Sequence, residues 1–201
     1  MLWLGWFGFN AGSALAANGV AGNALLTSQI GAATCTLVWL FLSWKRSGKP
    51  SIAAVINGAI AGLAGVTPAA GYISGESAFI LGIILGFGSY YGIVLFKERL
   101  KIDDALDVSS VHGVTGILGA LAIGVAASPL IMPNGPVGWI HGNPAQLGIQ
   151  AFGIAVAAAF AFVVSLAIFK IIDKTIGLKV SDEEEEAGLD ITQHAEKAFN
   201  D

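Results

Sequence analysis

The segment Val108-Ser-Ser-Val-His112-Gly-Val-Thr-Gly-Ile-Leu-Gly119 is apolar and rich in glycine, and its one ionisable side chain is that of His112. A segment of this kind is typical of a membrane-spanning helix. An ionisable group inside a bilayer is costly, so one that is present usually lines a cavity or a substrate path. His112 is therefore the first candidate functional residue. The alternative interpretation is a core histidine that hydrogen-bonds a neighbouring carbonyl.

The whole chain has the composition of a multi-spanning membrane protein. Hydrophobic residues make up 55% of it and charged residues 12%, about half the charge that is usual in a soluble domain. Crossing a bilayer takes about 20 apolar residues, and runs of that length recur. We predict an all-α polytopic membrane protein whose membrane domain, residues 1–177, precedes an acidic tail, residues 178–201. Its six transmembrane helices are expected at about residues 1–17, 24–44, 52–73, 77–97, 107–127 and 146–177.

The distribution of charge predicts the orientation in the membrane. In a six-span topology all ten lysine and arginine residues follow the second, fourth or sixth span, whereas the opposite side carries one formal charge, Glu76. Cytoplasmic loops carry the excess of Lys and Arg. We therefore expect the basic loops and both termini in the cytoplasm. The net charge of −4 comes mainly from residues 182–186 and indicates little about partners.

The first predicted span is short. Residues 1–13 would reach about 20 Å as a helix, whereas the hydrocarbon core is about 30 Å thick. The chain enters this apolar segment without a basic region, so a secretory signal is not predicted. We expect that an N-terminal part precedes these residues in the complete protein.

Glycines recur four residues apart in several spans. They are expected to allow close helix packing, because small residues let backbones approach in lipid. The pairs are Gly8/Gly12, Gly58/Gly62 and Gly82/Gly86, with a similar strip at Gly113, Gly116 and Gly119.

Pro68 lies within the third predicted span. Since proline lacks an N–H group, it should kink or end the helix near residue 64 and free backbone carbonyls. Such a break is tolerated where protein or a water-filled cavity satisfies those groups. Both a helix end and a ligand site are consistent with this pattern.

The first span carries a stripe of aliphatic, aromatic and hydroxyl side chains. Leu2, Trp6, Phe9 and Ser13 are spaced by four, three and four residues, so they share one helix face. The stripe indicates either packing or a pore lining. An aromatic face can stabilise a cation by about 0.5–2 kcal/mol, and a ring in a narrow path can act as a steric gate.

His112 shares a helix face with Val108 and Thr115. At membrane depth its imidazole should be uncharged, because a buried charge is costly. One ring nitrogen then donates and the other accepts, so the ring can hold a small polar molecule or relay a proton. Asp107, preceded by Asp103 and Asp104, is expected either to cap this helix or to line the cytoplasmic mouth.

An enzyme is not predicted. No nucleophile–base pair, phosphate-binding loop or cluster of metal ligands is recognisable, so we expect no catalytic residue, no metal site, no cofactor and no nucleic-acid partner. The single cysteine, Cys35, is interpreted as a small buried hydrophobic residue. His141, in the turn-rich stretch at 128–145, is interpreted as a solvated loop residue.

Four segments resemble the ammonium transporter (Amt/Mep/Rh) family. They are Trp6-Phe-Gly-Phe-Asn-Ala-Gly-Ser13, Gly65-Val-Thr-Pro-Ala-Ala-Gly-Tyr72, Asp103-Asp-Ala-Leu-Asp-Val-Ser-Ser-Val-His-Gly113 and Gly188-Leu-Asp-Ile-Thr-Gln-His-Ala-Glu-Lys-Ala-Phe199. Members of this family have eleven spans, arranged as two inverted five-helix halves plus a long final helix, and form trimers. The resemblance implies that the present chain supplies spans six to eleven, the C-terminal half, and that the N-terminal half is missing.

The resemblance also implies roles for individual residues. Phe9 is similar to one of two stacked phenylalanines that close the outer pore, Ser13 to the hydroxyl of the ammonium-recruitment site, and His112 to the second of two pore histidines. The tail resembles the segment that docks with PII-type signalling proteins. Residues that match inner-pore positions are Leu2, Trp6, Ile60 and Val108.

The family pattern is incomplete in this chain. The first pore histidine, the other gate phenylalanine, the recruitment-site tryptophan and an early structural aspartate would belong to the missing half. Ser109-Ser110 also replaces a bulkier pair expected before Val111.

The function implied is ammonium transport by a homotrimer in the lipid bilayer. Ammonium would bind at an outer site and lose its proton, and ammonia would cross a hydrophobic, histidine-lined pore. The chain by itself is expected to be inactive. The alternative is an ammonium-sensing membrane protein that signals through its cytoplasmic tail.

Overall fold

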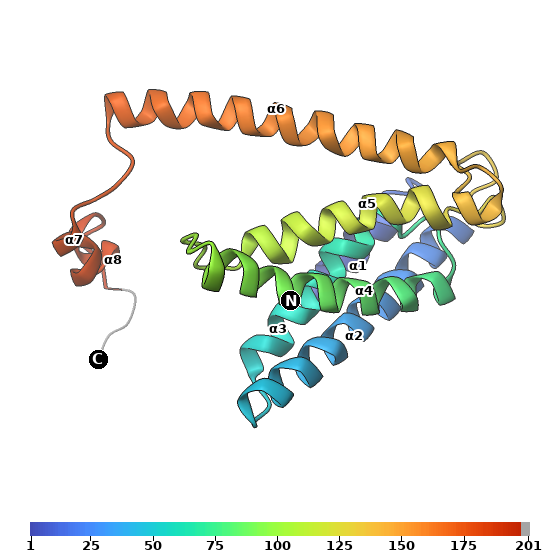
Figure 1. Ribbon diagram of the computed structural model, residues 1–201, viewed down its shortest axis with the longest axis horizontal. Coiled ribbons are helices and arrows are strands. Elements are labelled where there is room, and N and C mark those ends of the chain that lie inside the picture. The colour runs from blue at the N-terminus through green and yellow to red at the C-terminus, as the bar shows by residue number, and fades with distance from the viewer. Residues whose placement is uncertain (198–201) are drawn as a thin grey trace. The chain divides into compact units, whose positions relative to one another are not determined.

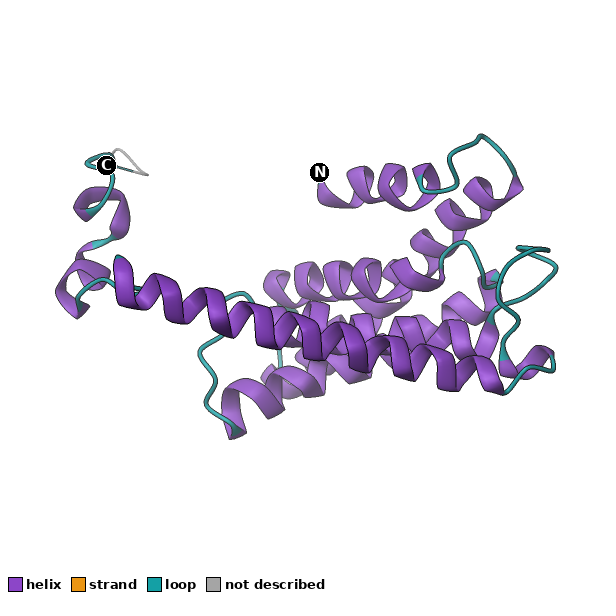
Figure 2. Ribbon diagram, turned by 90° about the horizontal axis from the view of Figure 1, so that it is seen from above, coloured by secondary structure: helices purple, strands orange, loops and turns teal. Residues whose placement is uncertain are grey.

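The computed structural model describes residues 1–197, and these form helices and loops without a β-strand (Figures 1 and 2). The last two residues of the tail segment that ends at Phe199 lie outside the described range. The chain divides into two compact units, residues 1–154 and the residues from Ala155 onward. The boundary falls inside one long helix, because such a helix makes most of its contacts within itself. The expected division at residue 177 remains a prediction.

Helices account for most of the described chain. Five stretches are long and apolar enough to cross a membrane, namely Gly19–Ser47, Ile52–Ala69, Gly75–Arg99, Ser109–Ala126 and Ala145–Thr175. The helices are α1 (Leu2–Gly12), α2 (Gly19–Ser47), α3 (Ile52–Val66), η1 (Thr67–Ala69), α4 (Gly75–Ile93), η2 (Val94–Arg99), η3 (Ser109–Val114), α5 (Thr115–Ala126), η4 (Trp139–His141), α6 (Ala145–Thr175), α7 (Asp182–Ala187) and α8 (Leu189–Thr192). Of these, η1 and η4 are 3-10 helices, whereas η2 and η3 are π-helices.

The expected first span, residues 1–17, is wrong in its length. Helix α1 has 11 residues and therefore rises about 16 Å. The backbone leaves the helix after Gly12, and Leu15 has a φ of 54°. Asn18 then starts the next helix, since its side chain accepts a hydrogen bond from the Ala21 N–H at 3.1 Å. The other five predicted spans each overlap one of the five long apolar helices, with ends that differ by up to five residues.

Close packing at glycines joins α2, α3 and α4. A Cβ added at Gly62 would lie 2.6 Å from the Ala32 Cα, and one added at Gly82 would lie 2.7 Å from the Thr34 Cβ. Larger side chains would force these helices apart, so the backbones pack directly against each other. The core that forms around these contacts includes Leu63, Val66, Ile73, Leu81 and Leu85.

Helix α3 ends two residues before Pro68, which agrees with the expected break. The carbonyls beyond the break are satisfied by side chains from α2. The Asn23 amide donates to the Ala70 and Ile73 carbonyls, each at 3.0 Å, and the Thr27 hydroxyl donates to the Ala70 carbonyl at 2.8 Å. The break is therefore held by protein, as backbone groups at membrane depth require.

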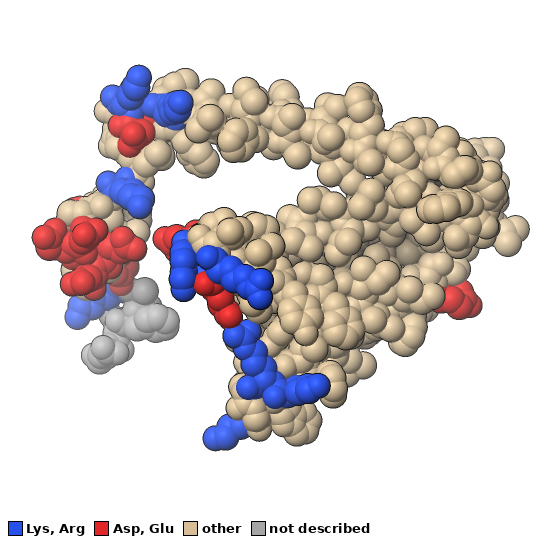
Figure 3. Space-filling view, in the orientation of Figure 1, with Lys and Arg blue, Asp and Glu red and all other residues tan. Residues whose placement is uncertain are grey.

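The cations of the first unit gather at one end, which we call the basic end (Figure 3). Four of them lie in the last turns of two helices, Lys45 and Arg46 in α2 and Lys97 and Arg99 in η2. Glu76 lies in the first turn of α4, at the opposite end of that helix from η2 and its cations. This charge distribution is the one from which the orientation was predicted.

Candidate functional site

The stripe predicted on α1 borders two cavities. A cavity of about 420 Å³ is lined by Met1, Leu2, Gly5, Trp6 and Phe9. A second one of about 290 Å³ includes Phe9, Asn10 and Ser13 together with Thr67, Gly71 and Tyr72. Phe9 lines both, so it lies where an apolar groove meets a cavity whose wall includes polar side chains. We call these the apolar groove and the polar cavity.

The polar cavity is built by α1, the start of α2 and the chain that follows the α3 break. Asn10 is 6% exposed and donates from its amide to the Ser28 hydroxyl at 2.8 Å. The Ser13 hydroxyl donates to the Phe9 carbonyl at 2.8 Å. Because the Ser13 hydroxyl donates its hydrogen to this carbonyl, its oxygen can accept a hydrogen bond from an N–H donor.

Trp6 anchors α1 to the α3 break. Its indole N–H donates to the Thr67 hydroxyl at 2.8 Å, and its ring meets the Phe9 ring edge to face, with centroids 6.3 Å apart. Thr67 and Asn10 are positioning residues that we did not predict. Their signal was visible as polar residues inside apolar runs next to Phe9 and Pro68.

His112 lies in η3 with its side chain exposed. Within the described residues His112 is therefore not part of the buried core. A Cβ added at Gly113 or Gly116 would meet no atom within 4 Å, so the space beside the imidazole is open. A single turn of π-helix inside an α-helix is frequent at functional sites. Neither cavity at Phe9 includes His112, so these residues do not share one cavity here.

Of the three aspartates expected at the inner mouth or as the helix cap, Asp104 is the one whose carboxylate meets the free N–H groups at the start of this helix. The Asp104 carboxylate accepts from the Val108 N–H at 2.9 Å and from the Ser109 N–H at 2.8 Å, and the Ser109 hydroxyl bonds the same carboxylate. The hydrogen bond from Ser109 lowers the pKa of Asp104 below its usual value of 3.8.

Asp107 joins three elements instead of capping one. Its carboxylate accepts from the Asn57 amide of α3 at 2.9 Å and pairs with the Lys97 ammonium of η2 at 2.9 Å. It has a φ of 57°, a left-handed conformation that aspartate tolerates better than most residues. The loop before η3 is thus tied to both neighbouring helices, which fixes the start of the segment that carries His112.

The remaining predicted pore residues differ in their surroundings. Ile60 is partly buried and packs against the hydrophobic core. Val108 and Leu2 are 48% and 66% exposed. Asp103 is exposed in the loop before η3. None of these four positions is tested by the geometry of this chain, and their assignment to a pore stays a prediction.

The family model described as Ammonium Transporter Family matches residues 1–199. The chain belongs to this family. Ammonium transporter 1 of Dictyostelium discoideum is 52% identical to it over 200 residues, which are 100% of this chain and 43% of that protein. Ammonium transporter Amt1 of Archaeoglobus fulgidus is 43% identical, with coverage of 99% and 50%.

Solved structures agree with the sequence relatives. The crystal structure of Candida albicans Mep2 matches with a TM-score of 0.84 and 35% identity, covering 91% of this chain and 42% of that chain. A structure named "Sensor Amt Protein" matches with a TM-score of 0.84 and 30% identity, covering 96% and 46%. The chain thus spans about half the length of the relatives that it matches.

Family membership and the five apolar helices identify a multi-pass membrane protein. The two relatives above are ammonium transporters by name. Among residues 1–197, no group of three or more His, Cys, Asp or Glu side chains could hold a metal ion.

Proposed function

We propose that this chain forms one half of an ammonium transport pore in the plasma membrane. The observation that carries the proposal is the position of Phe9, whose ring borders both the polar cavity beside Ser13 and the apolar groove beside Trp6. That order of surfaces suits a substrate that is bound as a cation and then continues as a neutral molecule.

The chemistry of the passage follows from desolvation. Ammonium can be held at the polar cavity by hydroxyl and cation–π contacts, because its N–H groups are donors and its charge is attracted by an aromatic face. A cation that enters an apolar groove loses its hydration, and the cost falls if it first gives up a proton. A potassium ion has no proton to lose, so the groove would select against it.

We assign His112 to the continuation of this path. Its open face, with space beside Gly113 and Gly116, leaves room for a second wall that contributes further pore residues. An uncharged imidazole there can accept from or donate to ammonia and can carry a proton in turn. Leu2, Ile60 and Val108 would line the inner part, and Asp103 would lie at the cytoplasmic mouth.

We further propose that these residues correspond to spans six to eleven of the eleven-span transporters. The motif at residues 6–13, the long helix α6 of 31 residues and the tail motif from Gly188 support this half. The share of each relative that is covered, 43% and 50% for the two proteins above, fits one half without saying which. On this assignment the tail is cytoplasmic, a PII-type protein is a candidate partner there, and the transporter is a homotrimer.

The test is methylammonium uptake into proteoliposomes. The chain alone should give background uptake, because one half cannot close a pore. Co-expression with the first half of a related transporter should restore uptake, whereas co-expression with the second half should not; the reverse result would show that the chain supplies the other half. In the restored protein, His112→Ala should abolish currents carried by ammonium, while unchanged currents would remove His112 from the path.

An ammonium sensor is the second candidate. One solved structure that resembles the chain is named "Sensor Amt Protein", and the tail has structure of its own. Within that tail, Ser181 and Glu184 form a capping box, and the Gln193 amide donates to the Glu184 carboxylate at 3.0 Å. A sensor would show ammonium-dependent change in the tail without net uptake, so hydrogen exchange and uptake measured on the same restored protein separate the two functions.

A further inference from the structure

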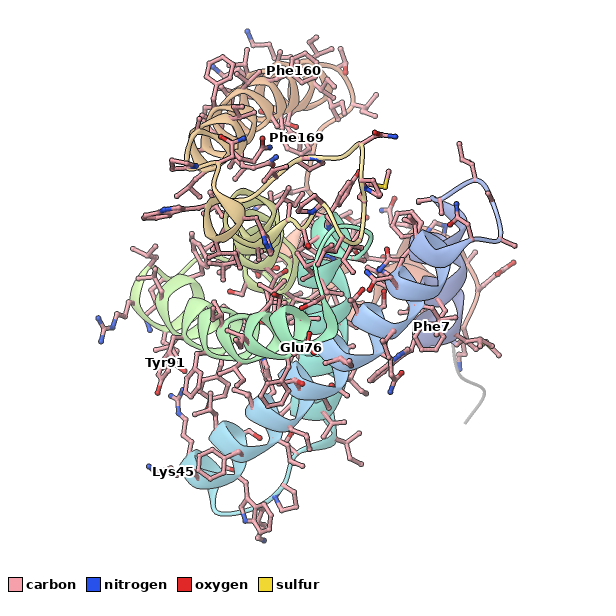
Figure 4. All side chains as sticks on the ribbon, turned by 90° about the vertical axis from the view of Figure 1, so that its right-hand side faces the viewer. Phe7, Lys45, Glu76, Tyr91, Phe160 and Phe169 are labelled. Carbon is pink, nitrogen blue, oxygen red and sulfur yellow. The ribbon has the colours of Figure 1, made fainter. Side chains whose placement is uncertain are left out.

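The loop that joins α5 to α6 contributes a side chain to the polar cavity, that of Met132. The other lining residues belong to α1, the turn after it, the start of α2 or the chain that follows α3. Figure 4, seen from the end of the first unit where this loop lies, shows the loop beside α1, the helix that carries Phe7. The proposed transport path gives Met132 no role, although it lies at the same cavity as Phe9 and Ser13.

Backbone hydrogen bonds hold Met132 at the cavity. The Ser128 N–H donates to the Tyr72 carbonyl at 2.8 Å, which ties the start of the loop to a residue of the cavity wall. The Met132 N–H donates to the Ser128 carbonyl at 3.1 Å, and the Met132 carbonyl accepts from the Gly135 N–H at 2.9 Å. The backbone of Met132 is therefore bonded on both sides and fixed relative to the cavity.

The root of the Met132 side chain is confined, whereas its tip is adaptable. A Cβ added at Gly135 would lie 2.6 Å from the Met132 Cγ and 2.9 Å from its Cβ, so the Gly135 backbone packs directly against the root of the side chain. Methionine is unbranched and polarizable, and its thioether can adjust to the shape of a neighbouring group. Met132 thus offers a fixed but adaptable apolar surface.

The wall of the polar cavity is of two kinds. Ser13 and Asn10 carry oxygen atoms that can accept hydrogen bonds, whereas Met132, Val20 and Ala24 are apolar. An ammonium ion has N–H donors in every direction, so it gains nothing from an apolar wall. A primary alkylammonium ion keeps three N–H donors and replaces the fourth with an alkyl group, which is stabilised when it leaves water for an apolar contact.

The polar cavity has room for the larger ion. Its volume is about 290 Å³, whereas a water molecule takes up about 30 Å³ of the liquid. Because an ammonium ion is close to water in size, the volume of this cavity does not exclude an ion with a short alkyl group. Discrimination between the two ions therefore depends on the chemistry of the wall.

We propose that Met132 is a specificity-determining residue of the polar cavity, where its thioether and terminal methyl group contact the alkyl group of a primary alkylammonium ion. The ammonium end of that ion lies beside Ser13 and Phe9. Ammonium itself does not need Met132, because its contacts are a hydroxyl group and an aromatic ring. The inference rests on the proposed ammonium transport and names the residue that decides between ammonium and its alkylated relatives.

The first test is inhibition of methylammonium uptake by ammonium and by ethylammonium in the restored transporter. Met132→Ala should raise the inhibition constant of ethylammonium about fourfold, the loss expected when one CH₂ group loses its apolar contact. The inhibition constant of ammonium should not change. Met132→Leu, which conserves volume, should keep both constants. The matched control is Leu130→Ala, because Leu130 belongs to the same loop, is 89% exposed and does not line the cavity.

A second measurement needs only the chain itself in detergent. The chain has two methionines, Met1 and Met132, so carbon-13 labelling of methionine methyl groups gives two NMR signals, which Met132→Leu assigns. Ethylammonium chloride should shift the Met132 signal at concentrations where ammonium chloride and sodium chloride do not. The Met1 signal should stay in place, because Met1 lines the apolar groove and not the polar cavity.

The outcomes separate this inference from the proposed function. If uptake is normal and Met132→Ala raises both inhibition constants equally, or neither, the inference is overturned and the transport function stands. Equal shifts of the Met1 and Met132 signals would also overturn it, because the ion would then have no defined contact. If the restored transporter shows only background uptake, the transport function fails. A Met132 shift specific to ethylammonium would then support the contact by itself, and its absence would overturn the contact as well.

Discussion

The α2–α3–α4 interface and the helices α1 and η3 differ in what surrounds their glycines. At the interface, a Cβ added at Gly58 would lie 2.6 Å from the Trp39 Cβ, and one at Gly86 would lie 2.6 Å from the Val38 Cβ. On α1 and η3, a Cβ added at Gly8, Gly12 or Gly113 would meet nothing within 4 Å. The same four-residue spacing of glycines therefore occurs both where helices pack closely and where the helix surface faces open space.

This difference separates the part of the chain that packs against itself from the helix faces that are open to another surface. The packed positions join three helices into a core that is complete within the first unit. The open positions lie beside Phe9 and His112, the residues to which we assign the passage of substrate. Four substitutions, each matched by a second at a position with contrasting surroundings, would test the difference.

The largest effect is expected from removing core volume. Leu85→Ala, at a fully buried position, should lower the free energy of unfolding by about 2–5 kcal/mol. Phe9→Ala should lower it by about 0.5 kcal/mol or less, because Phe9 is 62% exposed. Chemical unfolding in detergent measures both. Equal losses would mean that Phe9 belongs to the folded core, against the open position described here.

Adding a methyl group should have the next largest effect. A Cβ at Gly119 would meet the Gly65 carbonyl oxygen, so Gly119→Ala should cost about 1–3 kcal/mol, toward the upper end. Gly116→Ala, on the same helix with open space beside it, should be neutral or slightly stabilising. Thermal unfolding of the two variants checks this. A loss in Gly116→Ala as large as that in Gly119→Ala would contradict the open face.

Loss of a hydrogen bond should also cost more stability at the α3 break than at an exposed position. Asn23→Ala leaves the Ala70 and Ile73 carbonyls of the α3 break without their amide donor and should cost about 1–3 kcal/mol. Gln29→Ala removes the exposed bond from the Trp3 indole, and its effect should lie within about 0.5 kcal/mol of zero. If Asn23→Ala were also neutral, water and not Asn23 would satisfy the break.

The smallest effect is expected at the cap of η3. Asp104→Ala should cost about 0.5–2 kcal/mol near neutral pH. The pKa of Asp104 is lowered in the folded chain, so its stabilising contribution is present above its usual value of 3.8 and is lost as the pH falls through the lower folded value. Unfolding measured from pH 6 downward should show the difference between wild type and Asp104→Ala shrinking below about pH 3.8.

The matched control for this cap is Asp103→Ala, which removes an exposed neighbouring carboxylate of the same loop. It should leave stability unchanged over the same pH range. A difference between wild type and Asp104→Ala that stayed constant below the folded pKa would show that the carboxylate's charge does not matter there.

Much of the fold was predictable. The bilayer sets the length of an apolar run, and such a run can be recognised in a short stretch of sequence. The five long helices and the break before Pro68 were found in this way. The first span was misjudged because its apolar residues continue past Gly12, where the backbone already turns. The cap was left open between two roles for Asp107 because three aspartates precede η3, and spacing alone does not say which carboxylate folds back onto the free N–H groups.

The candidate site was predictable only in part. The spacing on α1 identified Leu2, Trp6, Phe9 and Ser13 as one face, and the family resemblance gave them roles. The partners that fix this face, Thr67 for Trp6 and Ser28 for Asn10, lie 61 and 18 residues away and could not be found from local spacing.

Sequence alone determined which segments can cross a membrane, which end of the bundle is basic, and which family the motifs resemble. Those properties depend on composition and on the regular rise of a helix. Both are determined by residues that are close together in the sequence. Only the tertiary structure decided which glycines are packed and which are open, and that Asp107 ties η3 to Asn57 and Lys97. Contacts of this kind depend on how helices distant in sequence meet, and similar glycine spacings are compatible with either outcome.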